Sequence, residues 1–340
     1  FTSRHANVAE RSGVRACGTC HATDWTAGDR QSHAEFLAAE KSLRTNADGM
    51  RDSGVYGLLD VDIVKRDDAT GTWLGLKTRN FGLDNREMKL EWLRQGNIGA
   101  SIEFSRIPRD QPFIYNTGLQ GIGTTTQTVA NIAPGTGSNV ELGTHRDRYT
   151  AKFFKNLGVG LNFNASVRNE TKEGTRNWGR GGAAEFAVEP IDSTIRIYEG
   201  TLSYSRDNLD LAGGYYGTSY DNSYSQVTTI GASTYYLSLP LDNKSYEFFL
   251  NGGYNFSPTT RATFKTSYSR ATQNNALPTT PGAGGTSPLA PSTLDGKLDT
   301  TLVEMGLTAR PMPQLSIAGN LRYRDFADKT PVQQYVFGGG

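Results

Sequence analysis

The sequence lacks an excess of charge of either sign. Its 340 residues carry 35 lysines and arginines against 34 aspartates and glutamates, a formal net charge of +1. Because no cationic surplus is present to neutralise a phosphate backbone, this composition disfavours nucleic-acid binding. Long apolar runs are also missing, since no stretch approaches the roughly 18 consecutive apolar residues that a membrane-spanning helix needs. The sequence therefore excludes a helical membrane protein.

Histidine and cysteine are scarce. Only four histidines are present, three of them within the first 33 residues, so a Ser–His–Asp triad cannot be argued. The carboxylates are spread over different segments among basic residues, which is typical of a solvated surface rather than of a paired acid–base site. We therefore predict no enzymatic activity. The two cysteines, Cys17 and Cys20, form one local motif and not a spaced disulfide framework.

Glycine and aromatic residues, in contrast, are abundant. The 39 glycines, 16 tyrosines and 15 phenylalanines favour strands and tight turns. From about Val55 onward, segments of about ten residues alternate between apolar and polar side chains. In 159–168, the odd positions from Val159 to Val167 are apolar, whereas Asn162, Asn164 and other even positions are polar. Since successive side chains of a strand point to opposite faces, this pattern predicts strands with one apolar and one wet face.

The alternation predicts twelve strands whose connections differ in length. Tight turns such as Gly96–Asn97 and long segments such as 108–145, 171–191, 220–244 and 273–297 follow one another. This arrangement is typical of an all-β, large antiparallel transmembrane β-barrel, although a soluble β-sandwich or β-helix would also alternate. The predicted strands are 55–66, 72–81, 86–95, 98–107, 146–156, 159–170, 192–205, 209–219, 245–256, 260–272, 298–309 and 314–326.

The order of turns and loops indicates one more strand before 55–66. With a periplasmic N-terminus, long loops face outward only if a strand precedes 55–66, and His33–Ser42 is the single candidate. Thirteen strands result, and an odd number does not close a bacterial barrel. We therefore expect this chain to form about half of a barrel. Residues 1–45 are expected to be a short periplasmic segment, and residues 46–340 to hold the transmembrane strands with long extracellular loops.

The run Cys17-Gly18-Thr19-Cys20-His21 is the C-x-x-C-H pattern of c-type haem attachment. The two thiols would form thioethers with the haem vinyl groups, and His21 would ligate the iron as the metal site. His5 or His33 could supply the sixth ligand, although a ligand from another chain or none is equally consistent. His145, on a predicted loop, is expected to be an ordinary surface residue. Haem c at this motif would place the N-terminal end in the periplasm.

Other interpretations of the motif remain. A structural zinc site needs four ligands, and no second cysteine pair is present. A thioredoxin-like pair needs a βαβ context, which the strand pattern does not offer. A disulfide or a regulatory thiol pair stays open beside covalent haem.

Segments near the N-terminal end carry a family resemblance. The runs Gly54-Val55-Tyr56, Arg66-Asp67-Asp68-Ala69-Thr70-Gly71-Thr72-Trp73 and Arg79-Asn80-Phe81-Gly82-Leu83-Asp84 resemble the first hairpins of the MtrB/PioB family of decahaem-associated outer-membrane proteins. The detailed match covers about the first third of the chain. Family members often carry C-x-x-C without a following histidine, so His21 implies either a haem of this chain's own or descent from a cytochrome–barrel fusion.

The resemblance implies a barrel sheath in the outer membrane of a Gram-negative bacterium. Such a barrel encloses a periplasmic multihaem c-type cytochrome and passes electrons across the membrane, in some cases toward an extracellular cytochrome. Side chains on the wet face would then line the lumen and contact the partner. These residues are Asp60, Asp62, Glu87, Lys89, Glu91, Glu103, Asn162, Asn164, Arg168, Glu247, Lys265, Arg322 and Arg324.

Two other functions compete with the electron conduit. A diffusion porin for small solutes would show a lumenal constriction loop and an arginine ladder, and the sequence gives no clear ladder. A haem protein in its own right would need a substrate pocket, which the sequence does not indicate.

Overall fold

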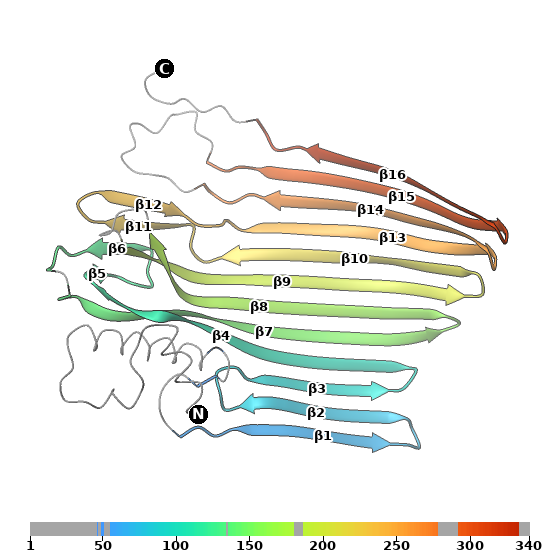
Figure 1. The fold of residues 1–340 in the computed structure, drawn as a ribbon, viewed down its shortest axis with the longest axis horizontal. Coiled ribbons are helices and arrows are strands. Elements are labelled where there is room, and N and C mark those ends of the chain that lie inside the picture. The colour runs from blue at the N-terminus through green and yellow to red at the C-terminus, as the bar shows by residue number, and fades with distance from the viewer. Residues whose placement is uncertain are drawn as a thin grey trace.

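The computed structural model describes residues 46, 49–50, 55–133, 135–179, 186–277 and 292–332. Twelve strands form one antiparallel sheet, in which each strand pairs with its neighbours in chain order (Figure 1). The strands are β1 (Leu59–Asp67), β2 (Thr72–Phe81), β3 (Glu87–Arg94), β4 (Ile98–Thr117), β7 (Ser138–Gly158), β8 (Leu161–Gly179), β9 (Phe186–Arg206), β10 (Leu209–Asn222), β13 (Asn243–Ser257), β14 (Thr260–Gln273), β15 (Gly296–Met312) and β16 (Leu315–Asp328).

These twelve strands confirm the twelve that alternation predicts. β1 and β16 are the two edges of the sheet, and the described strands leave it open. The predicted strand at His33–Ser42 and the whole segment 1–45 lie outside the described residues. Within the part that the structure describes, no helix has the length and apolar character needed to cross a membrane.

The two ends of the sheet differ in their connections. At one end, on the right in Figure 1, short turns join β1 to β2, β3 to β4, β7 to β8, β9 to β10, β13 to β14 and β15 to β16. Several of these turns use positive φ, for example 69° at Gly96 and 55° at Asp207, which suits the tight reversal. We call this the turn end, and the opposite end the loop end.

The prediction that 108–145 and 171–191 are loops is wrong in part. β4 and β8 run on to Thr117 and Gly179, and their partners β7 and β9 begin at Ser138 and Phe186. The β4–β7 ladder continues past a register shift between Asp110 and Ile114 as far as Thr117 paired with Ser138, and the β8–β9 ladder runs to Gly179 paired with Phe186. These residues alternate poorly in polarity, but their backbone groups still pair with a neighbouring strand of equal length.

A second, four-stranded sheet lies at the loop end beside β9, as Figure 1 shows. It joins two segments distant in sequence, because β6 pairs in parallel with β11. Leu119 of this small sheet, Leu142 of β7 and Val188 of β9 form a buried cluster. The only described core of this kind therefore supports the loop end. Its strands, in spatial order, are β12 (Thr234–Ser238), β11 (Gln226–Ile230), β6 (Thr126–Val129) and β5 (Leu119–Gln120).

The side chain of Gln127 ties the small sheet to β9. It is fully buried, its amide donates to the carbonyl of Val188, and its oxygen accepts from the Val188 N–H at 3.2 Å. The β9–β10 ladder ends at Ser193 paired with Asn222, so β9 has no β10 neighbour at Val188. The glutamine amide takes the place of the missing strand.

Candidate functional site: the charged face of the sheet

One face of the large sheet is apolar across all twelve strands. The register places Leu90 opposite Ile102, and further along the sheet Val303 opposite Tyr323. Leu90 and Ile102 keep 47% and 59% of their residue surface exposed, and no second layer of described residues packs on them. In water, such a continuous apolar face would be an aggregation liability, whereas lipid would cover it. We call it the apolar face.

Toward the loop end, a series of ion pairs forms the boundary of the apolar face. On β4 the apolar positions run from Ile98 to Phe104, and Arg106 follows, its Nε donating to Asp147 at 2.6 Å. The step from Ile98 to Arg106 rises about 26 Å along the strand, or about 20 Å after a tilt of about 40°. This height is comparable with the apolar band of about 25 Å in outer-membrane barrels. Similar pairs on the same face are Arg196–Asp221, Arg270–Asp299 and Lys329–Asp299.

The opposite face, which we call the charged face, carries the residues that alternation predicts for the lumen. Cross-strand register links Asp62, Lys77, Lys89 and Glu103 through successive neighbours to Thr150 and Arg168. A second row links Asn162 to Lys265 and Arg322. The other predicted lumenal residues lie on the same face. Four of them lie two positions along their strand from a residue of one of these rows: Glu87, Glu91, Asn164 and Arg324. Glu247 lies on a cross-strand row between the two.

Asp60 has a local partner at the edge of this face. It lies in the irregular pairing between Leu59 and Val61, where its carboxylate accepts the N–H of Asn80 at 2.7 Å. Its position near the start of β1 therefore fixes the end of β2.

The charged face also contains residues that the sequence analysis did not single out. Lys77, Arg148, Lys152, Arg261 and Glu304 all lie on it by register. Each falls at a polar position of a predicted strand, so the same period of two would have identified them.

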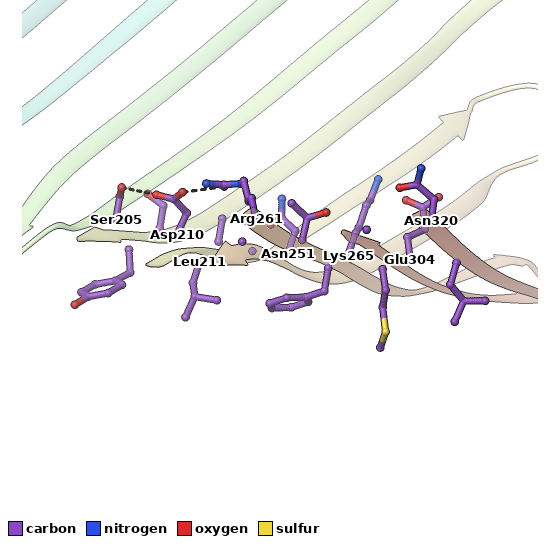
Figure 2. A pocket seen from close by; sticks show the side chains of 18 of the residues that line it. Ser205, Asp210, Leu211, Asn251, Arg261, Lys265, Glu304 and Asn320 are labelled. Carbon is purple, nitrogen blue, oxygen red and sulfur yellow. Dashed lines mark hydrogen bonds and ion pairs between the residues drawn. The ribbon is translucent and has the colours of Figure 1, made fainter. Parts of the chain in front are cut away.

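Cross-strand ion pairs cover much of the charged face. Lys152 contacts Glu103 at 3.1 Å, and Arg322 contacts Glu304 at 2.9 Å. Exposed pairs of this kind stabilise a fold by only about 0–1 kcal/mol each, so their number says more about the environment of the face than about stability. Figure 2 shows Ser205, Asp210, Arg261, Lys265, Glu304 and Asn320 on one side of the sheet and Leu211 on the other, with Asp210 bonded to Ser205 and Arg261.

Cations also gather beyond the level of the apolar band. Near the loop end of β8, burial and the neighbouring cations Arg146 and Arg176 lower the pKa of Lys172. Arg146 and Arg148 share a single carboxylate, that of Glu170, at 3.5 and 2.8 Å. The charged face of β7 and β8 is therefore rich in positive charge.

The haem motif lies outside the described residues, as do His5 and His33. Of the histidines, the structure describes His145, whose Nε2 lies 3.6 Å from Glu173 and whose side chain is 37% exposed. This partly exposed position on β7 agrees with an ordinary surface residue. Within the described residues, no group of three metal-ligating side chains gathers.

Solved structures similar to this chain include outer-membrane proteins at low identity. OmpT of Vibrio cholerae is 12% identical with a TM-score of 0.34, and the match covers 74% of this chain and 65% of OmpT. Its loop L8 deletion mutant gives 12% and 0.35, over 81% and 88% of the two chains. The CymD monoaromatic hydrocarbon channel gives 10% and 0.28, over 81% and 79%. Comparison with curated proteins found no match.

A family model gives the decisive comparison. It matches residues 37–337, which include every strand of both sheets, and it describes the outer membrane beta-barrel porin MtrB/PioB. The apolar face, the charged face and the regular strand order are the features that the strands of an outer-membrane barrel require. The chain belongs to the MtrB/PioB family of outer-membrane β-barrel porins.

Proposed function

We propose that this chain belongs to a barrel that encloses a multihaem c-type cytochrome and positions it for electron transfer across the outer membrane. Electrons do not cross about 30 Å of hydrocarbon without intermediate carriers. A haem chain cannot sit in lipid either, because its propionates and polypeptide need hydrogen-bonding partners. A wide barrel with a polar lumen meets both requirements.

The charged face is the observation that carries the proposal. It spans twelve strands and presents both signs of charge, with side chains such as Lys89, Glu103 and Arg322 left partly exposed. Such a wall suits a close polar interface with a protein, since charged groups of both signs fix orientation and exclude wrong partners. In this arrangement the short turns face the periplasm together with the N-terminus, and the small sheet faces outward.

The N-terminal motif adds a haem to the proposal. Cys17 and Cys20 would hold haem c through thioethers, and His21 would ligate the iron, which adds one redox centre at the periplasmic entrance. The protein itself then performs no catalysis. Haem staining of the chain on a denaturing gel tests this, because only covalent haem survives and Cys17→Ala with Cys20→Ala should abolish the signal.

The main test is the ratio of haem to barrel chain in a complex extracted gently from outer membranes. Pyridine haemochrome absorbance against protein mass should give several haems per chain. A ratio of one or less would refute the enclosed multihaem partner and leave at most the haem at Cys17 and Cys20.

A diffusion porin is the second candidate, favoured by a local excess of lysine and arginine on the charged face of β2 to β8. An open lumen with that lining would conduct small anions. Single-channel recordings separate the two functions: the sheath predicts little open-pore conductance, whereas a porin conducts steadily without any haem protein bound.

A further inference from the structure

The charged face holds one hollow with a marked excess of positive charge. It lies across β2, β3, β4, β7 and β8 and encloses about 530 Å³. Six cationic side chains line it against two carboxylates, which leaves four positive charges in excess. The cations are Lys77, Arg79, Lys89, Arg148, Lys152 and Arg168, and the carboxylates are Glu87 and Glu103.

Like charges face each other inside this hollow. Lys77 and Lys89 are direct cross-strand partners, and such pairs destabilise a sheet unless something compensates them. Carboxylates at the rim compensate three of the cations: Lys77 lies 3.5 Å from Asp62, Lys89 lies 2.7 Å from Glu91, and Arg148 lies 2.8 Å from Glu170. Lys152 contacts Glu103 at 3.1 Å. Four of the six cations therefore have a carboxylate partner, and the uncompensated charge of the hollow rests on Arg79 and Arg168.

Two arginines stand out because they form no ion pair within 4 Å with any described residue. Arg168 has Thr150 and Ile197 as its cross-strand neighbours, so no carboxylate lies directly opposite it. Arg79 lies opposite Glu87 in register, yet the two side chains make no contact of that kind. Both side chains are exposed. A free guanidinium presents paired N–H donors that match the two oxygens of a carboxylate.

The excess is local to this part of the sheet. The charged faces of β9, β10 and β13 carry the carboxylates Glu199, Asp210 and Glu247, and the described positions there include no lysine or arginine. Further on, the arginines have local contacts: Arg322 pairs with Glu304, and the Arg324 guanidinium lies 4.2 Å from the centroid of the Phe326 ring. A basic region and an acidic region therefore lie side by side on the same face.

We propose that the basic hollow docks carboxylate groups on the surface of the enclosed cytochrome, with Arg79 and Arg168 as their direct partners. The inference rests on the proposed function and adds to it where the partner attaches and with which chemistry. Because the neighbouring β9–β13 region is acidic, a partner with an acidic patch fits in one rotational orientation about the barrel axis. Acidic side chains and haem propionates offer the same carboxylate chemistry at this site.

The test compares two double variants of the full-length protein, purified as the complex with its cytochrome. Arg79→Gln with Arg168→Gln removes the two unpaired cations of the hollow. Lys265→Gln with Arg324→Gln removes two cations from the same face but outside the hollow, and it leaves the Arg322–Glu304 pair in place. The amount of each variant in the membrane and its strand content by circular dichroism verify folding.

Release of haem protein from the immobilised barrel is measured over time at low and high salt. The hollow variant should release cytochrome roughly 2- to 30-fold faster than wild type at low salt, as expected for losing two exposed charge contacts. The difference should shrink as salt screens the remaining charges. The Lys265→Gln and Arg324→Gln variant, which removes two predicted contact residues outside the hollow, should accelerate release less than the hollow variant does.

Three outcomes overturn the inference in distinguishable ways. If the hollow variant retains cytochrome like wild type, the docking site is wrong while the sheath function stands. Equal losses in both double variants would mean that general positive charge and not this hollow holds the partner. A wild-type barrel without any retained haem protein would refute the proposed function and the docking site together. In the same release assay, a glutamate-rich peptide and free haem are each added as competitor. Faster release with the peptide identifies acidic side chains as the source of the carboxylates, and faster release with haem identifies the propionates.

Discussion

An arginine placed on the apolar face should destabilise the protein in a bilayer far more than an arginine placed one residue away. Ile102 is the third of four apolar positions between Ile98 and Arg106 on β4, and 59% of its surface is exposed. A mid-bilayer arginine on the lipid face of a barrel costs about 2–4 kcal/mol. Ile102→Arg should therefore lower the folding equilibrium constant by about 30- to 700-fold, at about 1.4 kcal/mol per factor of ten.

The neighbouring residue provides a matched control. Ser101 lies on the charged face opposite Glu91 and Lys152, so an arginine there gains a carboxylate partner and stays out of lipid. Ser101→Arg should change the folding free energy by less than about 1 kcal/mol. Urea titration of folding into phospholipid vesicles, followed by tryptophan fluorescence and gel mobility, measures both variants. Equal effects for the two, or a neutral Ile102→Arg, would refute the assignment of the faces and revive the soluble sandwich.

Two further predictions concern the loop end and the band boundary. Gln127→Ala removes both hydrogen bonds to Val188 and leaves the buried N–H and C=O of Val188 unpaired, which should destabilise the small sheet by about 2–3 kcal/mol. Hydrogen exchange should rise in β6 and β11 and stay unchanged in the large sheet. A uniform rise in exchange would contradict this local role. Asp147→Ala removes the carboxylate partner of Arg106 at the edge of the apolar face and should lower the folding free energy by about 1–3 kcal/mol in the same vesicle assay. Asp68→Ala, which breaks an exposed turn pair with Arg66, should change it little. Equal effects of the two variants would show that the boundary pair contributes no more than an exposed pair.

The period of two in the sequence was sufficient to find the large sheet. All twelve predicted segments correspond to its strands, because lipid on one side and water on the other impose opposite requirements on successive residues. The segment 159–168, for example, alternates from Val159 onward, and its residues from Leu161 form the start of β8, while Val159 lies in the preceding turn. Where both faces of a strand lie in the same environment, this constraint is absent, and the sequence no longer alternates between apolar and polar residues.

That loss of constraint explains the errors at the loop end. Beyond Arg106 and Asp147 the strands leave the apolar band, and residues such as Thr117 and Ser138 need no fixed polarity on either face. Their strand structure comes from pairing with an equally long neighbour, which is a non-local property. The small sheet is harder still, because β6 and β11 are about a hundred residues apart and pair in parallel. Only the three-dimensional arrangement brings Gln127 to the unpaired edge of β9.

The charged face shows most clearly what cross-strand register adds to a sequence pattern. Alternation alone assigns Lys89, Glu103 and Arg168 to one face, and their mixed signs along the chain suggest a balanced wall. Register changes that conclusion, because it sets Lys89 beside Lys77 and leaves Arg168 between Thr150 and Ile197. The net charge of +1 for the whole chain therefore conceals a separation into a basic and an acidic region. A wall divided in this way can orient a charged partner, which an evenly mixed wall of the same net charge would not do.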